Sequence, residues 1–454
     1  MQSTSARLPG ESRPISTAVI AAGMVLSGMG TTILGPILPL LAAHWHLRDS
    51  QSGLLLTAEF LGLSIGSIAI ARSLRLSLLL GIGAATAGFG ALARLTRPSA
   101  NFFAVLPGAS PADHASLYHA ASFNGLPAGN LLAGLAVLFC AGFGLGLLIT
   151  SNNLIAGERY RSRPGPPLTL LNFGWSLGAV LSPLLVAALT PAYSVATLLA
   201  SLATAFLLLG LAASFDLRLQ HAADHEPAPD RDSNTSPSDL PSDAPSDARN
   251  TAPPSDRKTS PSATPNPAPA GVSPRVLLLF AALFFLYGGV ESSLNGWLTT
   301  YTLRYGRHSL SGSQSTTLLF WIALTAGRAL SALVLIRIAE RPLLLGSLSL
   351  AVLATSGLIF AHTLGAISLC AVLLGLSLAP CFPATLALML EQCPRPRQAA
   401  LALAVTGLGG AALTAMMGET SSRTGSLQVA LLLPLAGTLA LLALYLRPPW
   451  SRQQ

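Results

Sequence analysis

Hydrophobic residues in this chain gather in runs of about 20 positions, and short polar stretches rich in arginine separate the runs. A helix of this length crosses the hydrocarbon core of a bilayer, which is roughly 30 Å thick. Backbone polar groups cannot stay unpaired in lipid, so such runs must be helical. The pattern predicts twelve membrane-spanning helices, at residues 16–43, 52–72, 76–94, 130–156, 166–189, 193–213, 275–302, 314–336, 342–361, 364–390, 398–420 and 426–446.

The twelve runs form two similar sets of six. A shift of 233 residues pairs Gly142 with Gly375, and the hydrophobic runs and basic loops fall into the same register. Nearer the start of the chain the shift is 261 residues and pairs Gly28 with Gly289. The first half is therefore longer by 28 residues, which the stretch 96–129 supplies. A duplicated six-helix unit is typical of a large class of transporters.

We therefore predict an all-α membrane protein with twelve transmembrane helices in two six-helix repeats. The polar stretches around the two repeats set the predicted domain boundaries. The domains are a cytoplasmic tail at 1–15, a first six-helix half at 16–213 with an outer insertion at 96–129, a disordered cytoplasmic linker at 214–274, a second six-helix half at 275–446 and a cytoplasmic tail at 447–454.

The linker differs in composition from everything around it. Residues 221–274 contain twelve prolines and no aromatic side chain, and their only larger aliphatic residues are Leu240 and Val272. Such a segment cannot bury enough apolar surface to offset an ordering entropy of about 1–2 kcal/mol per residue. A regulatory segment and a plain tether both fit this composition, and we favour the tether. For the insertion 96–129, a cap over the outer mouth and a tolerated loop both stay open, and we favour the loop.

The arginines predict the orientation in the membrane. With the N-terminus in the cytoplasm, the inner loops and tails hold 13 arginines outside the linker, and the outer loops hold 6. This excess follows the positive-inside rule, and it accounts for the net charge of +8 without a nucleic-acid partner. We expect both termini and the linker on the cytoplasmic side of the plasma (inner) membrane. Only 10% of the residues are charged and 51% are hydrophobic, which excludes an ordinary soluble domain.

Polar and aromatic side chains near the middle of the predicted spans mark the candidate site, because a polar group inside a bilayer is costly. The candidates for contact with a solute are Asn152, Asn172, Trp175, Glu291, Asn295 and Trp321. Two further residues, Glu59 and Arg328, are candidates for carrying a proton or forming an ion pair. The candidates come from both halves of the chain, as expected for a cavity between the repeats.

Several of these residues have two interpretations. Glu291 and Asn295 are four positions apart and share one helical face, where they could hydrogen-bond the hydroxyl groups of a polar solute. Alternatively, Glu291 pairs with Arg328 on the next helix. An apolar site favours the protonated form of a carboxyl group, so Glu59 could carry a proton, or it could be a structural contact between the halves.

The sequence does not indicate an enzyme. It contains no metalloprotease motif, no nucleophile elbow and no nucleotide-binding loop. None of the four cysteines has the spacing of metal ligands. We therefore predict no catalytic residues, no metal and no cofactor.

Three stretches, together with the repeat and the topology, carry a resemblance to a known family. They read GPILPLLAAHWHLRDSQSG at 35–53, FFLYGGVESSLNGW at 284–297 and GLSLAPCFPATLALMLE at 375–391. The chain resembles the major facilitator superfamily, and most closely its fucose-permease-like sugar transporters. The resemblance implies a rocker-switch transporter with a central cavity into which Glu291 faces.

Two departures from the family pattern change this picture. The loop at 71–75 lacks the aspartate that usually forms gating contacts there. The acidic residues of proton-coupled fucose permeases would fall near Gly35 and Leu148, where this chain has none, so proton coupling of that kind is not expected.

The leading hypothesis is a secondary transporter that moves a small polar solute, with a sugar as the example implied by the resemblance. Its expected partners are the solute, the lipid bilayer and a coupling proton or ion. Two alternatives stay open. Efflux of amphipathic compounds predicts drug sensitivity when the protein is deleted, and a transporter-like sensor predicts solute binding without counterflow.

Overall fold

The computed structural model describes residues 16–70, 73–97, 128–159, 165–224, 274–334, 337–392 and 396–446. Both predicted tails, most of the insertion 96–129 and most of the linker 214–274 lie outside the described residues. The part of the chain that is described is helical and contains no strand.

The six helices of the first half are α1 (Thr17–Trp45), α2 (Asp49–Ile68), α3 (Leu74–Leu95), α5 (Ala128–Arg159), α6 (Gly165–Leu189) and α7 (Val195–Asp224). The helices of the second half are α8 (Pro274–Tyr305), α9 (Leu310–Val334), α10 (Glu340–Phe360), α11 (Leu364–Leu378), α12 (Cys381–Gln392), α13 (Pro396–Thr424), α14 (Leu427–Ala430) and α15 (Leu432–Leu446). Each of the twelve predicted spans is occupied by helix, so the predicted fold class is confirmed.

Two predicted spans are each divided into two helices. The span 364–390 breaks between α11 and α12 at Pro380, and the span 426–446 breaks between α14 and α15 at Leu431, three residues before Pro434. A proline has no backbone N–H to donate to the carbonyl four residues earlier, and its ring crowds that carbonyl, so the helix breaks in the preceding turn. Both breaks are therefore explained by a proline inside the apolar run.

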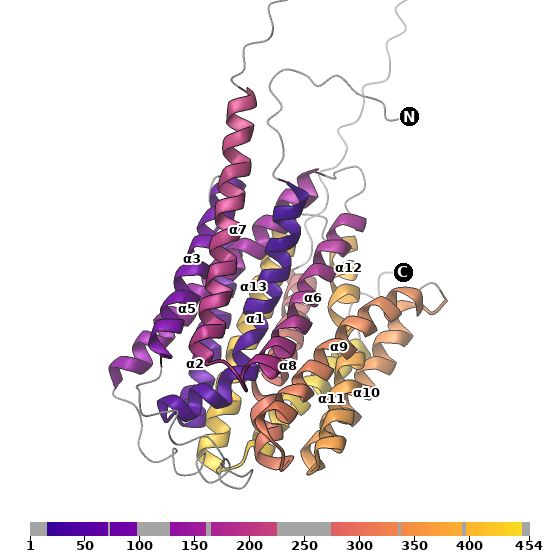
Figure 1. Cartoon of the computed structure of the whole chain (residues 1–454). Coiled ribbons are helices and arrows are strands. Elements are labelled where there is room, and N and C mark those ends of the chain that lie inside the picture. The colour runs from indigo at the N-terminus through magenta and orange to yellow at the C-terminus, as the bar shows by residue number, and fades with distance from the viewer. Residues whose placement is uncertain are drawn as a thin grey trace, which may run out of the picture.

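The helix α7 extends beyond the predicted boundary at 213 and ends at Asp224. Figure 1 shows it projecting beyond its neighbours at the end where α1 begins. Its last turns contact the start of α1, because the backbone N–H of Ser16 donates to the Asp216 carboxylate over 2.6 Å. We call this end of the bundle the proximal end. The opposite end, where α1 ends and α2 begins, is the distal end.

Nine helical segments in the described part of the chain are long and apolar enough to cross a membrane. The helices α2, α9 and α13 are not among them. Each of the three packs against helices on more than one side: α2 against α5 and α13, α13 against α2 and α8, and α9 against α6 and α11. Their polar side chains are therefore shielded from lipid by protein, which reduces the cost of burying them.

The most extensive contacts between the halves in the described part of the chain join α2 with α13, α1 with α8, and α6 with α9. Glycine allows the closest approaches. A Cβ atom at Gly35 of α1 would lie 2.0 Å from the backbone oxygen of Asn295 of α8. A Cβ atom at Gly53 of α2 would lie 2.9 Å from the backbone oxygen of Thr414 of α13. Small residues at these positions let the helices of the two halves pack backbone to backbone.

At the distal end, polar contacts join the halves. The Asp49 carboxylate of α2 accepts hydrogen bonds from the Arg304 guanidinium at the end of α8 and from the Ser421 hydroxyl of α13. Near the start of α9, the Gln314 amide donates to the Pro36 carbonyl of α1 over 3.2 Å, which also joins the two halves. We call Asp49, Arg304 and Ser421 the distal latch, because they connect helices of opposite halves.

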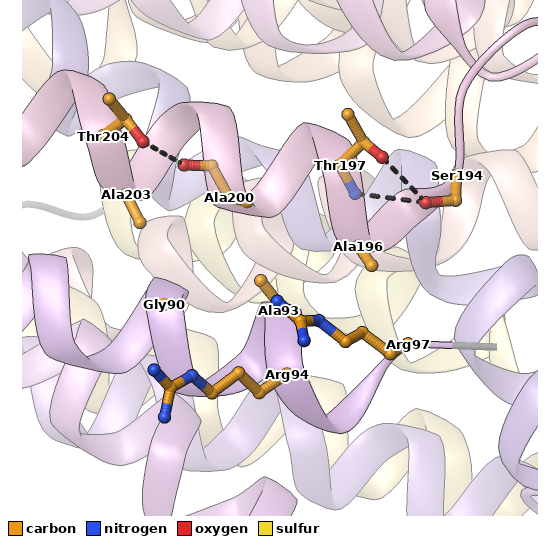
Figure 2. Close-up of a pocket in the computed structure, with 10 residues that line it drawn as sticks. All are labelled: Gly90, Ala93, Arg94, Arg97, Ser194, Ala196, Thr197, Ala200, Ala203 and Thr204. Carbon is orange, nitrogen blue, oxygen red and sulfur yellow. Dashed lines mark hydrogen bonds between the residues drawn. The ribbon is translucent and has the colours of Figure 1, made fainter. Parts of the chain in front are cut away.

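A surface groove also lies at the distal end, between the last turns of α3 and the first turns of α7 (Figure 2). It is formed within the first half alone, so it is separate from the interface between the halves.

Candidate functional site

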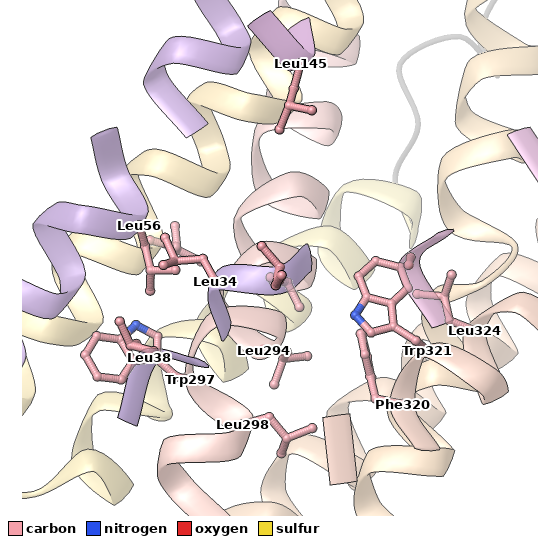
Figure 3. Close-up of a cluster of buried hydrophobic side chains, with 14 of the residues drawn as sticks. Leu34, Leu38, Leu56, Leu145, Leu294, Trp297, Leu298, Phe320, Trp321 and Leu324 are labelled. Carbon is pink, nitrogen blue, oxygen red and sulfur yellow. The ribbon is translucent and has the colours of Figure 1, made fainter. Parts of the chain in front are cut away.

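Buried side chains from both halves fill the middle of the bundle. Figure 3 shows Trp321 of α9 on one side of this cluster and Trp297 of α8 on the other, with Leu34 of α1 and Leu294 of α8 between them. Trp297 and Trp321 are at most 2% exposed. The helices α1, α8 and α9 therefore meet here with few gaps, and the polar groups of the site lie next to this apolar cluster.

Asn295 and Trp321 form a buried polar contact at the site. The indole N–H of Trp321 donates to the Asn295 side-chain oxygen over 2.8 Å. Both residues are buried: Trp321 is 2% exposed and Asn295 is 3% exposed. The pair satisfies two groups that would otherwise be costly inside a membrane, and it fixes how α8 and α9 face each other.

Arg328 lies seven residues after Trp321, two helical turns along the same face of α9. Its Nη1 atom donates to the Ser176 hydroxyl of α6 over 2.8 Å, which connects the two halves. Its guanidinium carbon lies 5.8 Å from the centre of the Trp175 ring, in the range of a cation–π contact. The Trp175 and Trp321 rings are themselves in edge-to-face contact, with centres 5.6 Å apart.

The negative partner of Arg328 is Glu291. The Arg328 Nη2 and Glu291 Oε1 atoms are 3.5 Å apart, long for a charge-assisted hydrogen bond. The two side chains keep 22% and 13% of their surface exposed, respectively. The ion pair is therefore long and partly exposed, and either partner can change its hydrogen bonding while the other charge stays nearby.

Some polar atoms around this ion pair complete no hydrogen bond among the described residues. They are the Arg328 Nε atom, the Thr325 hydroxyl and the Tyr287 hydroxyl. Tyr287 lies one turn before Glu291 on α8 and close to both charges. Buried polar atoms are almost always paired, so these three point to a site that accepts further hydrogen bonds.

The structure brings together five of the candidate residues, namely Trp175, Glu291, Asn295, Trp321 and Arg328. The sequence alone did not identify Ser176, Tyr287 or Thr325 as part of the same group. Ser176 is an ordinary hydroxyl residue of α6, and only the packing of α6 against α9 makes it a neighbour of Arg328. Thr325 lies on α9 itself, three residues before Arg328, and nothing in the sequence distinguishes it from other threonines. Tyr287 carried a signal, because it lies four residues before Glu291 and shares its helical face.

Asn152 lies elsewhere in the first half. It is fully buried in α5, and neither its amide oxygen nor its amide nitrogen has a hydrogen-bond partner in the described part of the chain. Its amide faces α1, where a Cβ atom at Gly23 would come within 2.8 Å of the nitrogen. Asn172 is exposed on α6, one turn before Ser176.

Glu59 is a buried carboxylate of α2. Its side chain is 1% exposed, and neither oxygen has a hydrogen-bond partner among the described residues. The helix α5 approaches α2 closely here, since a Cβ atom at Gly142 would lie 1.9 Å from the Glu59 backbone oxygen. The carboxylate belongs to the first half, whereas Arg328 pairs with Glu291 in the second half.

Comparison with known proteins gives one family and several similar folds. The family model described as Major Facilitator Superfamily matches residues 20–415. The chain is similar in structure to the xylose transporter XylE from E. coli in a partially occluded inward-open conformation, at 14% identity with a TM-score of 0.63, covering 96% of this chain and 97% of that one.

Two further solved structures show the same fold. A D-xylose-proton symporter is 14% identical with a TM-score of 0.64, and the match covers 94% of this chain and 96% of that one. The transporter FucP in an outward conformation is 17% identical with a TM-score of 0.53, and the match covers 96% and 98%. No curated protein matches the chain.

Proposed function

Because this chain belongs to the major facilitator superfamily, a family of membrane transporters, we propose that it carries a small polar solute of the sugar class between its two halves by alternating access. The observation that carries the proposal is the group around Arg328, which takes Trp175 and Ser176 from one half and Glu291, Asn295 and Trp321 from the other. Solute sites of such repeat proteins lie near the midplane, between the repeats.

The chemistry of this group suits a hydroxylated ring. The two tryptophans offer aromatic faces to the C–H groups of a sugar, and Arg328, Glu291 and Tyr287 offer donors and acceptors to its hydroxyl groups. A solute would take the place of the Arg328–Ser176 contact. Arg328 would keep its charge balanced by Glu291 while it binds the solute, because the two groups are already only loosely paired.

The distal latch supports the alternating-access part of the proposal. Asp49 joins α2 to both Arg304 and Ser421, so these bonds must break when the halves separate at the distal end. We propose that the distal end is the outer side, with both termini and the linker in the cytoplasm and the protein in the inner membrane. The excess of arginines in the predicted inner loops and tails supports this orientation.

Glu59 is our candidate for a coupling proton. A carboxylate that is buried without a partner gains from binding a proton, and the D-xylose-proton symporter with the same fold gives coupling of this type a precedent. In this proposal Glu59 binds and releases the proton within the first half, and it does not contact the solute.

The test uses purified full-length protein in vesicles. Counterflow of labelled D-xylose and L-fucose is measured in the wild type and in the Trp321→Phe variant, and binding of each sugar is followed by thermal shift. Trp321→Phe keeps an aromatic ring but removes the donor to Asn295, and we expect it to lower counterflow at unchanged protein yield.

Three other outcomes would contradict the proposal. Binding without counterflow would favour a sensor, and transport of amphipathic drugs with no response to sugars would favour efflux. Equal counterflow in the wild type and in Trp321→Phe would place the solute elsewhere in the protein.

A further inference from the structure

The groove between α3 and α7 has a volume of about 460 Å³. Its walls are the end of α3, from Gly90 to Arg97, and the start of α7, from Ser194 to Thr204. A second cavity of about 310 Å³ continues it along α3 and shares Gly90 and Arg94 with it. The volume of the first lies within the range of about 300–1,000 Å³ that is usual for small-molecule sites.

Small residues produce the hollow. Among the described residues, a Cβ atom built at Gly90 would meet only the Ala203 methyl group, 3.8 Å away, so these residues leave space above Gly90. The polar groups on the α7 wall bond among themselves: the Thr204 hydroxyl donates to the Ala200 carbonyl, and Ser194 and Thr197 bond each other. The floor and wall of the groove therefore present mainly hydrocarbon.

The mouth of the groove carries two exposed cations, Arg94 and Arg97. Figure 2 shows both side chains turning back along α3 towards Gly90 and Ala93, beside α7. Neither forms an ion pair with a described residue, and the acidic residues described at the distal end, Asp49 and Glu419, are already paired with arginines. Long cationic side chains at the end of a membrane helix reach the interface, where the charged headgroups of lipids lie, so these two arginines would attract an anionic headgroup.

We propose that this groove binds one anionic phospholipid from the leaflet at the distal end. Its phosphate group contacts Arg94 and Arg97, and one acyl chain lies over Gly90 between α3 and α7. From Ser194 to Thr204 the α7 wall covers eleven residues, whose ten steps of 1.5 Å span about 15 Å. This is about half of the roughly 30 Å hydrocarbon core, which is the depth of one leaflet.

The position of the groove favours a lipid over the transported solute. Both walls belong to the first half, and Ala200 and Thr204 are exposed on the face of α7 that borders the groove. The groove has no residue in common with the central group around Arg328. A second occupant to exclude is the segment 98–127, which follows Arg97 directly and contains Asp113.

The test counts bound lipid on the full-length protein. The protein is reconstituted in nanodiscs of phosphatidylcholine with one tenth phosphatidylglycerol, released, and weighed by native mass spectrometry. We expect one phosphatidylglycerol retained per wild-type chain. The Arg94→Gln/Arg97→Gln variant should lose affinity by about fivefold for each arginine removed, because an anionic surface attracts each basic side chain with about this strength.

Two variants provide the matched comparisons. Gly90→Leu fills the groove and leaves both arginines in place, so it should also lose the retained lipid. Arg48→Gln removes another exposed arginine of the distal end that lies outside the groove, and it should keep the lipid. If the double arginine variant fails to fold, Gly90→Leu decides the question alone.

Three results would overturn the proposal. The first is equal retention by the wild type and by Gly90→Leu. The second is equal retention of phosphatidylcholine and phosphatidylglycerol once their abundance is taken into account. The third is retention that appears only in an Asp113→Asn variant, since that would show that the segment 98–127 occupies the arginines in the native chain.

Discussion

The distal latch predicts that a single charge controls which conformation the protein adopts. Asp49 accepts from Arg304 and Ser421, and every one of these bonds joins opposite halves. The Asp49→Asn substitution keeps the size of the side chain but removes its charge. We expect the halves to separate more often at the distal end, while each half stays folded.

The expected size of the effect follows from the burial of the pair. A hydrogen bond to a charged group contributes about 1.5–3 kcal/mol when it is buried, and an exposed ion pair contributes about 0–1 kcal/mol. Arg304 and Asp49 keep 21% and 13% of their side chains exposed, so the latch lies between these limits. We take about 2 kcal/mol for the substitution, which is a shift of about 30-fold in the ratio of closed to open protein.

The assay measures a distance across the distal end by electron-spin resonance. Spin labels are attached at Tyr193 before α7 and at Ser311 in α9, both exposed, in a chain whose native cysteines are replaced by serine. The wild type should give mainly the short distance, and Asp49→Asn should populate a longer one. The control is Glu419→Gln, which removes an exposed ion pair with Arg423 within α13 alone.

Because the Glu419 pair does not cross between the halves, its loss should leave the distances unchanged. An Asp49→Asn distribution identical to that of the wild type would refute the role of the latch. A shift of equal size in Glu419→Gln would show that surface charge in general, and not the bonds of Asp49, controls the equilibrium.

Four further predictions concern the site and the topology. Glu291→Gln should lower sugar counterflow by about tenfold or more at unchanged protein yield, because it removes one charged hydrogen bond. A large fall in melting temperature with unaltered uptake would instead make Glu291 a structural counter-ion of Arg328. Glu59→Gln should abolish the dependence of uptake on a pH gradient but preserve counterflow, and uptake that still follows the gradient would remove Glu59 from coupling. Deleting about 30 residues of the linker should leave transport nearly intact, because the cost of closing a flexible loop changes slowly with its length; loss of membrane-inserted protein would show a structural role. Reporter fusions at Ser255 and at the C-terminus should both be cytoplasmic, and an outer signal from either would reverse the orientation.

The fold was predictable because its cause is local. Apolar runs of membrane length and basic loops identify each span without knowledge of its neighbours. A proline marks each of the breaks at Pro380 and near Pro434, but Pro36, Pro39 and Pro183 lie inside uninterrupted helices, so a proline alone does not predict where a helix breaks. The end of α7 was predicted too early because the apolar run stops at residue 213, whereas the helix continues to Asp224. In this extension, the Asp216 carboxylate accepts a hydrogen bond from the backbone N–H of Ser16.

The candidate site was only partly predictable, because it depends on contacts between helices. The i,i+4 spacing identifies the shared face of Glu291 and Asn295 from the sequence alone. The contact between Arg328 and Ser176 depends on how α6 packs against α9, and hydropathy gives no information about that packing. Asn152 was grouped with the site because it is polar and near mid-span, and the sequence does not show that its amide faces α1 at Gly23.

Asn295 makes two different contacts, one through its side chain and one through its backbone carbonyl. Its side chain holds Trp321 in the site, and its backbone carbonyl lies against Gly35, where α1 touches α8. When α1 moves away from α8, the peptide that carries the Trp321 partner loses its support. If the solute binds beside Trp321 as proposed, its affinity and distal opening are linked: a substitution at Gly35 that favours separation would change solute binding. By reciprocity, the solute would then change the opening equilibrium by the same factor.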